Sequence, residues 1–322
     1  MLHYISNLKD DAYTIEIEGK KHYYSISAFA DDTQIFSSTH KGYQTRFNHL
    51  TSYLATFKVA LSPAKTHYTY VSPEHKEAAC TISINKYSQQ TQRRTEDNTQ
   101  DVDEEGEEEM KPEETKTPTN VASPHEALRY LGAYLSLAGD WKYARTFLMQ
   151  KIDKSLSTIQ FKHLEWREVK YIVTSTIQAQ IQYYTLVTPL TQTELENLDS
   201  RITQKFRNSL KLASSTNAHI LHMDDKRSFG YGLPSVLDTH DHTLINAAQA
   251  TLTSSKPLGD LVRHSLKQYQ TETGWTTNPL NRRTCPNKPP KVNYWFSRVR
   301  EAMDRQDINI PITEPHRQKT SQ

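Results

Sequence analysis

The stretch that decides the fold lies near the amino terminus, where two β-prone runs flank a pair of acidic residues. It reads Tyr24-Ser25-Ile26-Ser27-Ala28-Phe29-Ala30-Asp31-Asp32-Thr33-Gln34-Ile35-Phe36-Ser37. Residues 24–29 and 33–37 are rich in β-branched and aromatic side chains, so they predict a β-hairpin with both acids at its turn. Asp is common in turns because it bonds to its own backbone. Two carboxylates between apolar strands, however, carry a charge cost that a bound cation would offset.

The cation that such a turn favours is Mg²⁺. Carboxylate oxygens are hard ligands, and Mg²⁺ commonly takes one or two of them together with substrate phosphates. Two such ions held about 3.5–4 Å apart are the usual arrangement for nucleotidyl transfer. The turn is therefore a candidate site for phosphoryl chemistry.

Further strands and one helix surround this hairpin. Residues 13–18 alternate with period two and end at Gly19, which predicts a strand. Apolar residues at helical spacing predict a helix over residues 42–59: Phe47, Leu50, Tyr53, Leu54 and Phe57. Pro63 blocks its continuation, and residues 67–71 and 79–87 are further strand candidates.

The net charge of the whole chain hides an asymmetry. The 322 residues carry 39 Lys and Arg against 37 Asp and Glu, a formal charge of +2. Residues 88–124 hold 11 acidic and 4 basic residues and almost nothing apolar, so we expect them to be disordered. The remaining chain has 35 basic and 26 acidic residues, a net of +9, which is the sign expected for contact with nucleic acid.

Beyond the acidic segment the pattern becomes helical. Residues 130–135 predict a strand or turn, and three apolar stripes over residues 148–159, 169–184 and 195–210 then predict a helical bundle. Thr191 or Thr193 is the expected cap of the third helix. Residues 258–262 predict a further helix start, and the polar, basic segment after Pro290 is expected to be loosely held.

Several classes of protein are excluded. No apolar run approaches the ~20 residues of a membrane span, and the amino terminus lacks a secretory signal. We therefore expect an intracellular protein of the nucleus or cytoplasm with no membrane partner. Cys80 and Cys285 are too isolated to predict a disulfide framework or a zinc site. Four histidines are interpreted as scattered residues in a chain with 14 of them: His219, His222, His240 and His242.

As an ordered set, the motifs of this chain resemble the reverse transcriptases of non-LTR (LINE-type) retrotransposons. Phe29-Ala30-Asp31-Asp32 is similar to the family's catalytic hairpin, Y/F-x-D-D, and Leu61-Ser62-Pro63-Ala64-Lys65-Thr66 to its L-N-x-x-K-T segment. Arg129-Tyr130-Leu131-Gly132-Ala133-Tyr134-Leu135 resembles the Y-L-G primer grip. Phe229-Gly230-Tyr231-Gly232-Leu233-Pro234-Ser235 resembles part of the thumb.

The resemblance spans residues 1–236 apart from the acidic segment, and it implies an α+β fold. Residues 1–87 would form a partial polymerase palm, with a small antiparallel sheet and a helix, and 88–124 the disordered insert. Residues 125–140 would form the primer-grip turn and 141–236 an all-helical thumb-like region. Residues 237–322 would add a helical and polar region that ends in the loose basic tail.

The resemblance also implies an activity, RNA-directed DNA polymerisation, and roles for single residues. Asp31 would bind the catalytic Mg²⁺ ions, with Asp32 as its weaker partner, and Lys65 would protonate the leaving pyrophosphate. Tyr130, Leu131 and Gly132 would contact the primer strand of a complex with an RNA template and a DNA primer. Two plainer interpretations stay open, a solvated Lys65 and an ordinary strand-end Gly132.

The upstream part of the family pattern has no counterpart here. In the family an earlier acidic motif bridges both metals, whereas only 30 residues precede Asp31, and Asp10 and Asp11 lie at a different spacing. We therefore expect a truncated remnant that extends no primer by itself. Two alternatives stay open. One is a non-catalytic nucleic-acid-binding protein derived from the enzyme, and the other is an interaction protein whose acidic segment contacts a partner.

Overall fold

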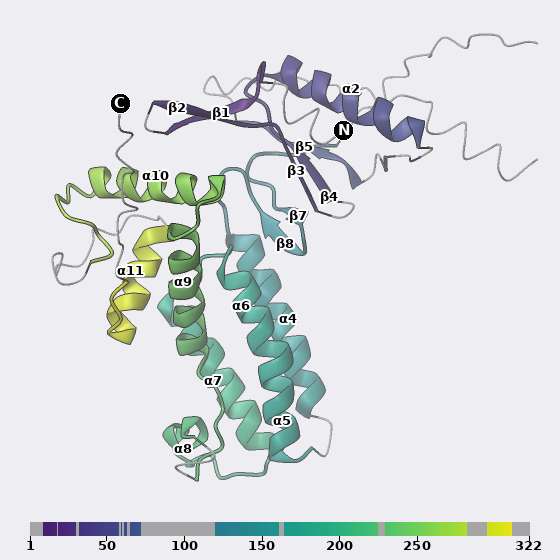
Figure 1. Ribbon diagram of the computed structural model, residues 1–322. Coiled ribbons are helices and arrows are strands. Elements are labelled where there is room, and N and C mark those ends of the chain that lie inside the picture. Colours follow the sequence, from purple (N-terminus) through teal and green to yellow (C-terminus); the bar gives the residue numbers. More distant parts are fainter. Residues whose placement is uncertain are drawn as a thin grey trace, which may run out of the picture. The chain divides into compact units, whose positions relative to one another are not determined.

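The computed structural model divides the chain into two compact units, Met1–Asp140 and Trp141–Gln322. It describes residues 9–17, 19–29, 32–57, 59, 61–62, 65–71, 120–160, 164–224, 229–281 and 295–310. Among these, the strands all lie in the first unit and the second is helical, which confirms the α+β class (Figure 1). The strand candidate at 79–87 lies outside the described residues. So does the predicted acidic segment at 88–124, apart from its last five residues.

Two antiparallel hairpins begin the first unit. β1 (Tyr13–Ile17) pairs with β2 (Lys20–Tyr24), and β3 (Ile26–Phe29) pairs with β4 (Asp32–Ile35). The predicted hairpin is thus confirmed, but Asp32 is the first residue of β4 instead of a turn residue, and Asp31 lies outside the described residues. The first strand of this hairpin is shorter than expected, because Tyr24 belongs to β2 and the buried Ser25 separates the two strands.

A helix and two shorter strand pairs complete the first unit. α2 (His40–Thr56) begins at Thr39, whose hydroxyl accepts a hydrogen bond from the Gly42 amide. β5 (His67–Tyr68) pairs with β6 (Asn120–Val121), and β7 (Leu128–Tyr130) pairs with β8 (Ala133–Leu135). We expected one small antiparallel sheet. Within the described residues the strands instead form separate two-stranded pairs, and the β5–β6 pair is parallel. A parallel pair needs a long connection, which the segment between these strands supplies.

The second unit is a helical bundle (Figure 1). Its helices are α4 (Lys142–Gln160), α5 (Trp166–Ile172), η2 (Val173–Gln178), α6 (Ala179–Thr185), α7 (Gln192–Ser209), α8 (Ala218–His222), α9 (Val236–Leu252), α10 (Pro257–Glu272) and α11 (Trp295–Gln306). α7 packs on α4, α5 and α9, and α9 also packs on α6, α10 and α11. None of the helices in the described ranges combines the length and apolar character that a bilayer span requires.

The predicted apolar stripes form the core of this bundle. Leu148, Ile152 and Leu198 are each no more than 1 % exposed. The second stripe runs through α5, η2 and α6 with buried residues four apart: Val169, Val173, Ile177 and Ile181. A four-residue step over-rotates an α-helix by about 40°, since the α-helix has 3.6 residues per turn. The π-helical segment η2 has wider turns, which keeps this stripe on one face.

The segment after Pro290 was predicted to be loosely held, but part of it forms a packed helix. Residues 295–306 form α11, which buries Phe296, Val299, Ala302 and Met303. These residues pack in one cluster with parts of α9 and α10, including Leu244, Ala248, Leu266 and Tyr269. The helical spacing of α11 was present in the sequence, but the neighbouring prolines and basic residues favoured a loop. Residues after 310 lie outside the described part.

Candidate functional site

The β3–β4 hairpin carries the acidic pair predicted to bind metal. Its register pairs Phe29 with Asp32, so Ala30 and Asp31 form the connection. Asp32 is the first residue of β4 and is exposed, while Asp31 lies outside the described residues. Phe29, on the opposite strand, is 67 % exposed. The hairpin therefore presents Asp32 to solvent beside an exposed aromatic ring.

A small aromatic cluster anchors this hairpin to the rest of its unit. Phe47 and Tyr68 are buried, and four partly buried residues pack against them: Ile35, Tyr43, Leu61 and Tyr70. The ring centroids of Tyr43 and Tyr68 lie 4.8 Å apart, and burial raises the pKa of Tyr43 to about 12. Because the cluster takes residues from β4, α2, β5 and the segment before Lys65, it joins the hairpin to that segment.

Arg46 of α2 provides a second anchor, which sequence reasoning missed. Its side chain is 1 % exposed, and Nη1 donates to the Gly42 carbonyl at 3.0 Å and to the Ser37 hydroxyl at 3.2 Å. Nη1 also donates to the Asp11 carbonyl at 3.3 Å, and Nη2 donates to the carbonyl of Asp10. Burial lowers the pKa of Arg46, and the charges of Asp11 and Asp10 oppose this. The contacts hold α2 against the ends of both hairpins.

The other predicted site residues lie on exposed or half-buried backbone. Lys65 is exposed, and its amide donates to the Ser62 carbonyl at 3.1 Å. Tyr130 ends β7, and Leu131 and Gly132 connect it to β8 with φ values of +49° and +85°. Positive φ at both central residues defines a type I′ turn, which suits a two-residue hairpin. Leu131 occupies this conformation at a cost of about 1–2 kcal/mol and is 37 % exposed. Strain of this kind is often found where a backbone contacts a ligand.

The metal prediction stays a prediction. Within the described ranges no three His, Cys, Asp or Glu side chains gather as a metal site. Asp32 is the described member of the acidic pair, and its exposed oxygen ligands suit Mg²⁺, which keeps several waters when it binds to proteins.

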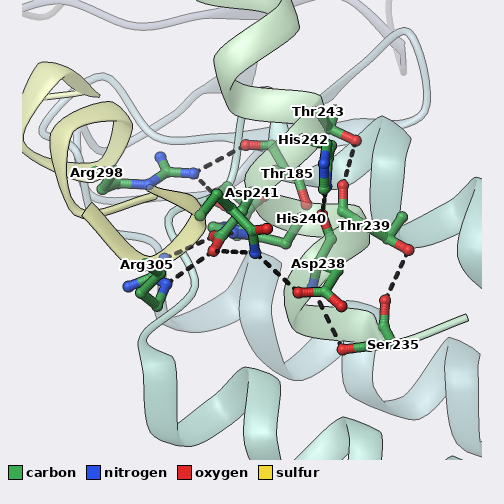
Figure 2. Close-up of polar contacts among 12 residues, drawn as sticks. Thr185, Ser235, Asp238, Thr239, His240, Asp241, His242, Thr243, Arg298 and Arg305 are labelled. Carbon is green, nitrogen blue, oxygen red and sulfur yellow. Dashed lines mark hydrogen bonds and ion pairs between the residues drawn. The ribbon is translucent and has the colours of Figure 1, made fainter. Parts of the chain in front are cut away.

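A polar cluster buried between α9 and α11 was also missed by sequence reasoning (Figure 2). Asp241 has no exposed surface, and Arg305 donates to both of its oxygens at 2.7 and 2.8 Å. His240, 2 % exposed, has its Nδ1 3.0 Å from Asp241 Oδ1. Gln306 adds a bond from Nε2 to Asp238 Oδ1 at 2.8 Å. Together these contacts fasten α11 to α9.

Burial and charge shift the pKa values within this cluster. Burial lowers the pKa of His240, the hydrogen bond to Asp241 opposes this, and the charges of Arg298 and Arg305 lower the pKa further. Burial acts to raise the pKa of Asp241, but hydrogen bonds from Arg305 and His240 outweigh it, so that pKa lies below its usual value. Burial therefore disfavours the charged form of His240, whereas the contact with Arg305 favours the charged form of Asp241.

A pocket of about 650 Å³ lies near the start of α9. Its lining includes Lys170, Gln182, His222, Asp224, Leu233, Ser235, Asp238 and His242. His222 and His242 each donate Nδ1–H to a backbone carbonyl, of Leu233 at 2.8 Å and of Asp238 at 2.7 Å. The first bond ties His222 to the segment before α9, and the second holds His242 against the preceding turn of α9 itself. The mixed charges of the lining select no single class of ligand.

Comparisons of the chain with protein-family models, with curated proteins and with solved structures found no match. Its function is therefore inferred from its own residues and the motifs they form. Of the residues missed by sequence reasoning, Asp241 and Arg305 are 64 positions apart, so no local spacing connects them. The only local signal was the run His240-Asp241-His242, which was interpreted as scattered histidines.

Proposed function

We propose that this chain derives from the RNA-directed DNA polymerase of a non-LTR retrotransposon and binds a primer–template nucleic acid. The observation that carries the proposal is the order of two tight hairpins along the chain. β3–β4 carries Asp32 as the first residue of β4, and β7–β8 carries Leu131-Gly132 in a strained, partly exposed turn. α2 and the Lys65 segment lie between them in sequence, as in the resemblance.

The distribution of charge supports a polyanionic partner. Met1–Asp140 has 14 basic and 21 acidic residues, a net of −7, whereas Trp141–Gln322 has 25 and 16, a net of +9. Within the second unit, the described residues carry 16 basic and 14 acidic side chains, so most of the excess lies in the segments between and after the helices. Arg282 and Arg283 are two of these basic residues. Lysine and arginine that neutralise phosphates release counterions, so affinity should fall steeply with salt.

Asp31 and Asp32 would hold Mg²⁺ at the β3–β4 connection. The ion would polarise a phosphoryl oxygen of the incoming nucleotide. In the resembling family a further acidic motif completes the two-metal site, and Asp31-Asp32 supplies only part of that ligand set. We therefore expect this 322-residue chain to bind a primer–template without extending it.

The first experiment measures binding. A labelled DNA primer annealed to a longer RNA template is titrated with the protein, and fluorescence anisotropy gives Kd at several salt concentrations. Replacing Arg282 and Arg283 by Gln should weaken binding and reduce the salt slope by about 0.9 for each lost phosphate contact. Replacing Lys20 and Lys21 of β2 by Gln removes the same charge from the first unit and should change little. Equal effects of the two variants would contradict a specific role for the second unit.

The second experiment measures chemistry. Purified protein, Mg²⁺, nucleotides and the same primer–template should give no extended product, and binding should survive EDTA. Extension that is abolished by Asp31→Ala would show that the chain is a complete polymerase. Loss of binding in EDTA would show that metal, and not basic charge, holds the nucleic acid.

A further inference from the structure

Arg298 of α11 is a half-buried cation with an unusual set of partners (Figure 2). Its Nη2 donates to the carbonyl of Thr185 at 2.9 Å and lies 3.5 Å from that of Thr188. Among the described residues, no carboxylate lies within ion-pair distance of it, although Glu301 acts at longer range. Within the described part of the chain, the hydrogen-bond partners of this guanidinium are thus backbone carbonyls, and none of them carries a full negative charge.

A second arginine converges on the same segment between α6 and α7. Arg145 of α4 donates from Nε to the Pro189 carbonyl at 2.7 Å, and its Nη1 lies 3.8 Å from Glu194 Oε1. Burial lowers the pKa of Arg298 to about 10, and the charge of Arg145 is the next largest cause. Two guanidinium groups therefore lie close enough to repel each other. Glu194 lies beside Arg145, whereas Glu301 acts on Arg298 only at longer range.

Donor groups without partners occur on Arg298 and on the two threonines whose carbonyls it contacts. Thr185 and Thr188 have no exposed surface, and neither hydroxyl has a hydrogen-bond partner among the described residues. The Nε of Arg298 is buried and lacks a partner within the same residues. Each buried donor left in this state costs about 1–3 kcal/mol, and native proteins contain few of them. These three donors belong to residues that contact one another through Arg298, and they suit a ligand with several acceptor oxygens.

We propose that Arg145, Arg298, Thr185 and Thr188 form a binding site for a single phosphate group. Guanidinium groups bind phosphate through paired N–H···O bonds, and threonine hydroxyls can donate to the remaining oxygens. The phosphate would offset the repulsion between the two arginines. Asp241 does not compete for Arg298, because Arg305 already binds both of its oxygens. The phosphate belongs either to a nucleic acid backbone or to a free anion.

The test is calorimetric titration of the purified full chain with inorganic phosphate. Wild-type protein should bind with a Kd tighter than roughly 1 mM. Thr188→Val, which keeps the side-chain shape, should weaken binding roughly tenfold, the loss expected for one hydrogen bond to a charged group. Arg298→Lys should weaken it further, because lysine lacks the paired geometry. Circular dichroism of each variant confirms that the helices remain.

Arg263→Lys is the matched control. Arg263 also donates to two carbonyls, of Leu252 and Ser254, but it has Asp260 as a carboxylate partner. The phosphate Kd should therefore not change in this variant. Absence of phosphate binding by the wild type, or equal Kd values for wild type, Thr188→Val and Arg298→Lys, would overturn the proposal.

A competition experiment identifies the source of the phosphate. If inorganic phosphate displaces a labelled oligonucleotide from wild type but not from Arg298→Lys, the site binds the nucleic acid backbone. If phosphate binds while the oligonucleotide is neither bound nor displaced, the site takes a free anion. Binding of free phosphate without binding of the oligonucleotide would support this site while contradicting the proposed function. Failure of the phosphate site and failure of the proposed function are therefore distinguishable.

Discussion

Replacing Arg305 by methionine tests how strongly the buried contact between α9 and α11 stabilises the helical unit. Arg305 donates both hydrogen bonds of a paired contact to Asp241, which has no exposed surface. The methionine keeps most of the side-chain volume but removes the charge. Asp241 would then lie inside the bundle without its guanidinium, with His240 and Gln306 as its remaining hydrogen-bond partners.

The magnitude follows from the cost of an uncompensated buried charge. Removing one partner of a buried ion pair typically destabilises a protein by about 3–5 kcal/mol. In a domain of roughly 150–250 residues each kcal/mol shifts Tm by about 2–4 °C, so the expected loss is ~6–20 °C. The double variant Asp241→Leu with Arg305→Met replaces the pair by apolar groups and should be near neutral, since such replacements are often neutral or stabilising.

Thermal unfolding followed by circular dichroism at 222 nm measures both variants. Arg263→Met is the control. It removes hydrogen bonds to two carbonyls and an ion pair with the partly exposed Asp260, but it leaves no fully buried carboxylate without its guanidinium, so it should cost less than Arg305→Met. A Tm for Arg305→Met equal to that of Arg263→Met would refute the reasoning. A double variant as unstable as the single one would show that packing, and not charge, is what Arg305 provides.

Three further predictions follow from local geometry. Because the pKa of His240 is lowered in the folded state, the unfolded chain binds more protons below pH ~6.5. The Tm should therefore fall from pH 7 to pH 5, and His240→Gln should make this fall smaller. Parallel curves of Tm against pH for wild type and variant would contradict this. Gly132→Ala should cost about 1–2 kcal/mol, since its φ is positive but nothing lies within 4 Å of the added Cβ. Gly230→Ala should cost more, because that Cβ would lie 2.2 Å from the Met223 carbonyl oxygen; urea titrations that rank the two in reverse would contradict this. Thr191→Ala should cost about 1 kcal/mol through loss of the α7 cap, and an unchanged urea midpoint would exclude it.

Periodic features of the fold could be predicted from the sequence because each depends on neighbouring residues. The α4 and α7 stripes repeat every three or four residues, and the hairpin around Asp32 is marked by its flanking strands. Thr191 was one of two expected caps, and the capping box with Glu194 selects it.

Contacts between distant residues could not be predicted in this way. Three such contacts join positions with no sequence periodicity between them: the parallel pairing of β5 with β6, the bonds of Arg46 to the turn before β1, and the Asp241–Arg305 pair. α11 was missed because prolines and basic residues nearby outweighed its own apolar spacing. The roles of Asp31, Asp32 and Lys65 stay predictions from the resemblance.

The most direct test of the proposed function compares two nucleic acids with the same total number of phosphates. One is an RNA template with a recessed DNA primer, and the other is a blunt DNA duplex. Anisotropy titrations at matched salt should give a lower Kd for the recessed hybrid, because the Leu131-Gly132 turn and the β3–β4 hairpin are proposed to meet a primer end. Equal Kd values would mean that the chain binds phosphates without recognising a primer–template, and absence of binding to either would contradict the account.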